Sequence, residues 1–194
     1  MQDKFINECD EGKIWKGLVA GLVGGLVAAW TMNQFQALVH NLFEGDQRSH
    51  GAQSMQKGSP QHGAGQELRE QGGDEEQDDA TERLANIISK TVLDHELSKK
   101  EKETAGTAIH YAFGIASGGF YGAAAELLPK ITLGAGLPFG AFVWLTADEG
   151  VVPLFGLSKA PTEYPFSTHA YALTSHIVYG LTADCVRRLV RRSL

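Results

Sequence analysis

Hydrophobic and polar positions are segregated along this chain rather than mixed. Four stretches contain no Asp, Glu, Lys or Arg, and they cover residues 17–43, 104–125, 131–147 and 164–183. They are 27, 22, 17 and 20 residues long, and a helix needs about 17–25 apolar residues to cross a bilayer core. The pattern therefore predicts an all-α integral membrane protein with four transmembrane helices.

The predicted plan alternates tails, spans and polar segments. It consists of a cytoplasmic tail at 1–16, transmembrane helices at 17–43, 104–128, 131–157 and 166–187, a long acidic loop at 44–79, an amphipathic helix at 80–98, and a basic cytoplasmic tail at 188–194. A cleaved signal peptide competes with the first span, because Val27-Ala28-Ala29 resembles a small-residue cleavage site. The acidic tail before this stretch and the helical spacing after it favour a retained helix.

The two segments between the first and second spans differ in composition. Residues 44–79 are rich in Gly, Gln, Ser, Asp and Glu, so we expect them to be disordered. From Ala80 onward, apolar positions repeat at helical spacing, and they are Leu84, Ile87, Ile88 and Thr91. Such a helix can lie on the membrane surface or pack on its own protein, and we expect the second arrangement.

Charge and cysteine content exclude several classes of function. Of the 194 residues, 23 are acidic and 17 basic, giving a net charge of −6, which argues against nucleic-acid binding because that requires a basic face. The basic cluster at the C-terminus follows an apolar stretch, as membrane-flanking residues do. Cys9 and Cys185 form neither a disulfide framework nor a metal-binding pattern, and no cofactor motif is present. We therefore predict no cofactor and no resident metal.

Small residues recur every four positions on the predicted spans. These glycines are Gly17, Gly21 and Gly25 on the first, Gly114, Gly118 and Gly122 on the second, and Gly136 and Gly140 on the third. Lipid tails are as apolar as leucine, so membrane helices associate through close backbone approach at small residues. We expect these faces to pack helices together; glycines lining a pore are the alternative.

The second half of the chain resembles a known family. His110-Tyr111-Ala112-Phe113, Ala125-Glu126-Leu127-Leu128-Pro129-Lys130-Ile131 and Pro153-Leu154-Phe155-Gly156-Leu157 are similar to segments of the YagU-like inner-membrane family, as is His176-Ile177-Val178 before Asp184. The likeness covers roughly residues 104–190. It implies a multi-pass protein of the bacterial inner membrane and supplies no substrate or catalytic residue. Lysine and arginine placement predicts that both termini are cytoplasmic, although Lys99, Lys100 and Lys102 oppose this orientation.

Ionisable residues inside predicted spans are costly and usually face a partner or a cavity. A polar cluster near the outer face is predicted from His40, His110, Asp148, Glu149, His169 and His176. At the other face, Glu126 and Asp184 lie near Lys130, Arg187 and Arg188, where we expect ion pairing.

Two functions compete for the histidine–carboxylate cluster. The first is a proton-responsive membrane protein, because histidine titrates near physiological pH. The second is a structural or partner-binding membrane protein with an external acidic loop, and a small transporter is a further alternative. A metal site formed by His40, His110, His169 and Asp148 ranks last, because no pair has local ligand spacing. No nucleophile and base can be assigned, so we expect no enzyme; the expected partners are the bilayer and a second copy or another membrane protein.

Overall fold

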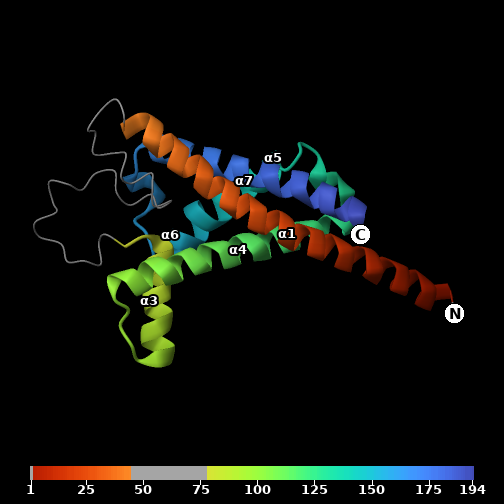
Figure 1. Cartoon of the computed structure of the whole chain (residues 1–194), viewed down its shortest axis with the longest axis horizontal. Helices are drawn as coiled ribbons and strands as arrows, with labels where there is room; N and C mark the ends of the chain where they lie inside the picture. Colours follow the sequence, from red (N-terminus) through yellow and green to blue (C-terminus); the bar gives the residue numbers. More distant parts are fainter. Residues whose placement is uncertain (1, 45–77) are drawn as a thin grey trace, which may run out of the picture. The chain divides into compact units, whose positions relative to one another are not determined.

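The computed structural model describes the backbone of residues 2–44 and 78–194, and the side chains of 12–42 and 78–194. Every regular element in these ranges is helical (Figure 1). The helices are α1 (Gln2–Glu44), α3 (Ala80–Leu93), α4 (Lys99–Leu127), α5 (Leu137–Thr146), α6 (Val152–Leu154) and α7 (Phe166–Ser193). Most of the loop predicted at 44–79 lies outside the described residues, as does the side chain of Cys9.

Among the described helices, α1 alone is both long and apolar enough to cross a membrane, over Gly12–Leu42. Helices α4 and α7 have 29 and 28 residues, which is sufficient length, but they carry more polar side chains. Helix α5 is strongly apolar and has only 10 residues. The fold is thus all-α with one candidate membrane helix, whereas the sequence predicts four spans.

The segment predicted as the third span, 131–157, is a series of short elements. A 3₁₀ turn at Pro129–Thr132 follows α4, and a glycine-rich turn leads into α5. In that turn Gly134 and Gly136 have φ values of 83° and 87°, which glycine adopts without strain. A π-turn at Ala147–Val151 then connects α5 to α6.

The chain divides into two compact units. The first contains Met1–Met32, Tyr111–Val143 and His176–Leu194, and the second contains Asn33–His110 and Trp144–Ser175. Helices α1, α4, α5 and α7 each contribute residues to both units.

In the first unit, small residues bring the helices into close contact. The face Gly17, Gly21 and Gly25 of α1 meets the face Gly122, Gly118 and Gly114 of α4 in antiparallel order. A Cβ added at Gly118 would lie 2.5 Å from both the carbonyl oxygen of Gly21 and Cα of Gly25. On the opposite side, Gly136 and Gly140 pack against α7, at Gly180 and His176.

Burial in this unit favours small and polar side chains over large apolar ones. Ala28, Ala29 and Ala183 are at most 1% exposed, and so is the carboxylate of Asp184. Large apolar side chains on the same helices are exposed instead, including Trp30, Phe113, Phe120, Phe142 and Leu189. Met32, Val143 and Tyr179 are buried with the alanines, so the unit has a small apolar core with many large apolar side chains outside it.

Candidate functional site

Glu149 lies on the π-turn that interrupts the helical segment after α5. Pro153 follows four residues later; its ring has no N–H and clashes with the carbonyl of residue i−4, which is Glu149. An extra residue in the turn relieves that conflict, and such π-turns frequently occur at functional sites. The local sequence therefore accounts for the irregular backbone that carries Glu149.

His169 stands in the first turn of α7 and contacts two acceptors in the second unit. Its Nδ1 lies 2.6 Å from Oε1 of Glu149, and its Nε2 lies 3.0 Å from the carbonyl oxygen of Pro161. Both side chains are largely buried, with 22% of His169 and 15% of Glu149 exposed. The imidazole thus joins the π-turn to the connection that precedes α7.

The number of protons in this contact follows from its geometry. A neutral imidazole has one N–H donor and one bare nitrogen, whereas a carboxylate and a carbonyl are both acceptors. Both contacts become hydrogen bonds when His169 is an imidazolium or when Glu149 is protonated. Either form holds one proton more than a neutral histidine beside an ionised carboxylate.

The connection held by His169 is folded by its own hydrogen bonds. The N–H of Lys159 donates to the hydroxyl of Tyr164 at 3.1 Å, and the N–H of Ala160 donates to Glu163 at 3.3 Å. The Tyr164 ring meets the His169 ring edge to face at 6.4 Å. Burial raises the pKa of the Tyr164 phenol, so its hydroxyl stays protonated at neutral pH.

The other predicted cluster residues are distributed between the two units. His40, His110 and Asp148 belong to the second unit, together with Glu149 and His169, and His40 is buried. His176 belongs to the first unit, where its backbone carbonyl faces Gly140. Within residues 12–42 and 78–194, no three His, Cys, Asp or Glu side chains are placed to hold a metal ion.

A second polar cluster surrounds Asp184 in the first unit. Its Oδ1 accepts from the hydroxyl of Tyr121 at 3.0 Å and from Nη2 of Arg187 at 2.9 Å, and its Oδ2 accepts from Nε of Arg188 at 2.7 Å. The Arg187 guanidinium also lies 5.5 Å from the centre of the Tyr121 ring, within cation–π range. Arg188 continues to the carbonyl of Thr132 at 2.9 Å. Asp184 therefore ties α4, the turn after it and α7 together.

Glu126 forms a separate ion pair near the end of α4. Its two oxygens accept from Nε and Nη2 of Arg191 at 2.7 and 3.1 Å, a bidentate geometry. Sequence spacing explains the pairs of Asp184 with Arg187 and Arg188, which lie three and four residues further along the same helix. It does not identify Arg191, 65 residues from Glu126.

Sequence reasoning also missed two partners in the second unit. The carbonyl of Pro161 is a backbone group, which no side-chain pattern identifies, and Tyr164 belongs to none of the predicted spans or clusters. The available signal was Tyr164-Pro165 immediately before the helix that carries His169, since a residue preceding proline is usually extended and marks a helix boundary.

Comparison with known proteins gives one family. A family model described as "Protein of unknown function (DUF1440)" matches residues 80–185, which is more than half of the chain. The match includes α3, α4, α5 and most of α7. It contains Glu149, His169, Tyr121 and Asp184, whereas Arg187 and Arg188 lie beyond its end. No curated protein and no solved structure matches the chain.

Proposed function

The chain belongs to the DUF1440 family of proteins of unknown function, and we propose that it is a multi-pass membrane protein that responds to protons. The chain has the four predicted spans in this proposal, lies in the inner membrane with both termini cytoplasmic, and resembles the YagU-like family. Its partners are the lipid bilayer and a second copy or another membrane protein. It acts by changing conformation and is not an enzyme.

The exposure of large apolar side chains supports the membrane location. Phe113, Phe120, Phe142 and Leu181 stand exposed on α4, α5 and α7, while Asp184 is buried against Tyr121 and Arg187. In water this arrangement leaves apolar area unburied, which is unfavourable by about 25 cal/mol per Å². Against lipid tails the same side chains are well solvated, and small and polar residues are the usual contents of helix contacts.

The single observation that carries the proton response is the imidazole of His169 between two acceptors. Its contacts with Glu149 and Pro161 are both hydrogen bonds only when the pair holds its additional proton. When that proton is lost, one of the two contacts has no hydrogen atom, and two acceptor atoms then face each other. The connection before α7 is then held less tightly.

The direction of the pH effect follows from proton linkage. The arrangement in which both contacts of His169 are hydrogen bonds holds one proton more than the arrangement in which one of them is lost. Lower pH therefore stabilises the doubly bonded arrangement, and higher pH favours its loss. Histidine normally titrates between pH 5 and 8, which sets the range to be examined. We call the Glu149–His169–Pro161 contact the latch.

A spin label on the connection tests the latch directly. Thr162 is exposed and is changed to cysteine in a full-length chain in which Cys9 and Cys185 are serine. The labelled protein is placed in nanodiscs, and nitroxide mobility is recorded from pH 5 to 8. We expect a restrained label at pH 5 and a mobile label at pH 8.

Two variants should shift this profile in opposite directions. Glu149→Gln supplies an amide N–H to Nδ1 of His169 without an added proton, so the label should be restrained at every pH. His169→Phe removes both hydrogen bonds, so the label should be mobile at every pH. Glu163→Gln is the matched control, because its amide oxygen still accepts from Ala160, and its profile should equal that of the parent. Identical profiles for all three variants and the parent would overturn the proposal.

Membrane embedding has its own test. The chain should sediment with membranes and stay there after alkaline carbonate washing, which removes peripheral proteins. Release into the wash would refute the membrane location, and the label experiment would then be repeated on the same chain in detergent-free buffer.

A further inference from the structure

Helix α3 has a well-defined beginning. The Asp79 carboxylate accepts from the N–H groups of Thr81 and Glu82 at 2.9 and 2.8 Å, and Glu82 accepts in return from the N–H of Asp79 at 3.0 Å. This capping box satisfies the free donors at the helix start. A largely buried ion pair, Lys102 to Asp78 at 2.7 Å, joins the same end to α4.

The face of α3 that packs on its own unit is polar. Glu82, Asn86 and Ser89 are buried, together with the small apolar side chain of Ala85. Asn86 accepts from the N–H of Leu97 at 3.1 Å, and Ser89 donates to the carbonyl of His95 at 2.8 Å. Close contact with α4 occurs at Gly106, where an added Cβ would lie 3.0 Å from the backbone nitrogen of Glu82.

The apolar face of α3 points away from these contacts. Ile87, Ile88 and Val92 are 51%, 48% and 72% exposed, and with the half-buried Leu84 they form one stripe at helical spacing. The sequence predicts that the helix packs on its own protein; it does so through its polar side. We refer to these four side chains as the apolar stripe.

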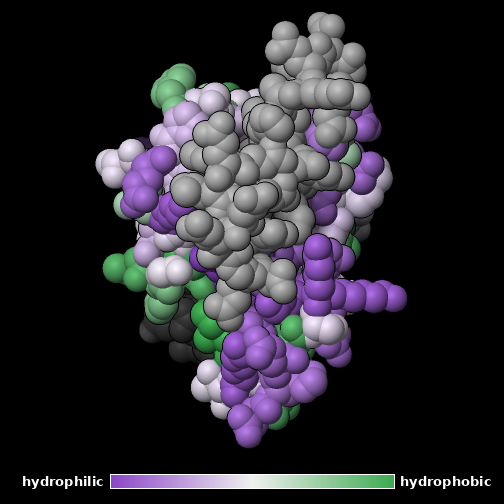
Figure 2. All heavy atoms as spheres, turned by 90° about the vertical axis from the view of Figure 1, so that its left-hand side faces the viewer, coloured by the Kyte–Doolittle hydropathy of each residue, from purple (hydrophilic) through white to green (hydrophobic). Residues whose placement is uncertain are grey.

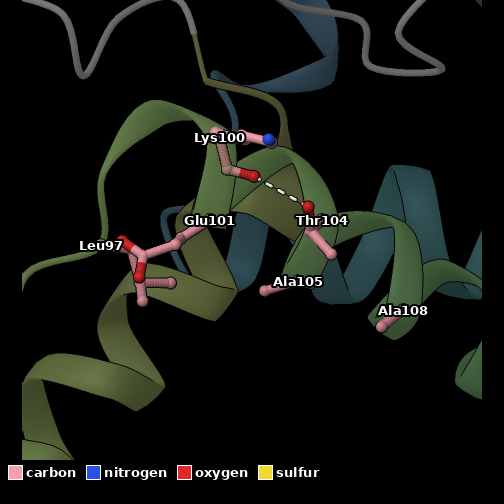
Figure 3. Close-up of a pocket in the computed structure, with 6 residues that line it drawn as sticks. All are labelled: Leu97, Lys100, Glu101, Thr104, Ala105 and Ala108. Carbon is pink, nitrogen blue, oxygen red and sulfur yellow. Dashed lines mark hydrogen bonds between the residues drawn. The ribbon is translucent and has the colours of Figure 1, made fainter.

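An apolar groove lies next to this helix on α4 (Figure 3). It has a volume of about 430 Å³, and it is lined by Leu97, Lys100, Glu101, Thr104, Ala105 and Ala108. Its polar groups are engaged locally: Thr104 donates to the carbonyl of Lys100 at 2.9 Å, and Glu101 accepts from the N–H and hydroxyl of Ser98. Those bonds hold the pKa of Glu101 below its usual value, so its carboxylate is charged at neutral pH. The apolar part of the groove is formed by Leu97, Ala105 and Ala108.

Two further observations indicate what covers the apolar stripe. Helix α3 runs across the start of α4 rather than along it (Figure 1). With the proposed second span on α4 crossing the bilayer, α3 runs along the membrane plane. In Figure 2 the lowest part of the molecule is mostly hydrophilic, with a few hydrophobic residues between the hydrophilic ones. The preceding segment 45–77 contains only two large apolar side chains, Met55 and Leu68, too few to cover the stripe.

We propose that α3 is an interfacial helix that places its apolar stripe among lipid headgroups and upper acyl chains, with the groove beside it in the same layer. The polar face holds the helix to α4, and the apolar face binds the bilayer. This inference rests on the proposed membrane location and is independent of the latch.

Fluorescence quenching in the full-length chain tests the orientation of α3. Single cysteines are introduced by Ile88→Cys on the apolar stripe and Lys90→Cys on a polar side of the helix, again with Cys9 and Cys185 replaced by serine. Each is labelled with an environment-sensitive dye and reconstituted in vesicles of phosphatidylethanolamine and phosphatidylglycerol. Spin-labelled lipid quenches from the bilayer, and iodide quenches from water.

We expect the two quenchers to rank positions 88 and 90 in opposite order. Lipid quenching should be several-fold stronger at 88 than at 90, and iodide quenching several-fold weaker. Flotation of each chain with the vesicles reports membrane embedding separately. If the chain floats but iodide reaches both positions equally, the interfacial helix is refuted and the membrane location stands. If position 88 is shielded from both quenchers and becomes exposed at low protein-to-lipid ratio, a second copy covers the stripe, which also overturns the inference. A chain that does not float refutes the membrane location itself.

Discussion

Replacing Gly118 by alanine is the most direct test of the close contact between α1 and α4. The added Cβ would lie 2.5 Å from Cα of Gly25 and 2.5 Å from the carbonyl oxygen of Gly21. Both neighbours are backbone atoms, so no side-chain rotation relieves the overlap. The two helices must move apart by about 1 Å to restore an ordinary carbon–carbon contact of about 3.5 Å.

The magnitude follows from two opposing effects. Overpacking of a tightly packed contact costs about 1–3 kcal/mol, and the upper part of that range applies here because the clash is with backbone on the facing helix. Alanine is a better helix former than glycine by about 1 kcal/mol, which offsets part of the loss. The net expectation for Gly118→Ala is a destabilisation of about 2 kcal/mol.

Gly12 provides the matched control on α1. A Cβ at Gly12 has no atom within 4 Å, so Gly12→Ala should gain helix propensity alone and stabilise the chain by up to about 1 kcal/mol. Both variants are compared by circular dichroism during titration from a mild detergent into sodium dodecyl sulfate. Opposite signs are expected. A stabilising effect of Gly118→Ala equal to that of Gly12→Ala would refute the packing of these helices through their glycine faces.

Three further outcomes are expected. Asp184→Ala should destabilise the chain by about 3–5 kcal/mol in the same titration, because it leaves Arg187 buried without a carboxylate partner. Asp184→Asn keeps an acceptor and should destabilise it less. Equal losses would contradict a role for the ion pair. Pro153→Ala supplies an N–H that can donate to the carbonyl of Glu149, as in a regular helix. The variant should therefore straighten the π-turn, displace Glu149 and abolish the pH response of the spin label at position 162. An unchanged response would show that the turn does not position the latch. An epitope tag at the C-terminus should be protected from external protease in spheroplasts, while segment 44–79 is cut. The reverse pattern would invert the predicted orientation.

Sequence by itself determined the local features of this protein. Four uncharged stretches long enough for membrane helices predict the all-α class, which the structure confirms for the residues it describes. Glycines four positions apart necessarily share one helix face, so Gly17, Gly21 and Gly25 are aligned by backbone geometry alone. The ion pair of Asp184 within α7 follows the same rule, because Asp184 and Arg188 are one turn apart. Each of these features depends on residues within a few positions of one another.

Tertiary structure alone decided which side chains meet across elements. Glu149 and His169 are 20 residues apart, and their contact requires the extra residue of the π-turn, which shifts every later side chain around the helix axis by about 100° relative to a regular helix. The orientation of α3 is decided in the same way: its periodicity defines an apolar and a polar face, but bonds from Asn86 and Ser89 to the chain after the helix select the polar one for burial. Periodicity specifies the faces of a helix, whereas their surroundings are set by contacts between distant segments.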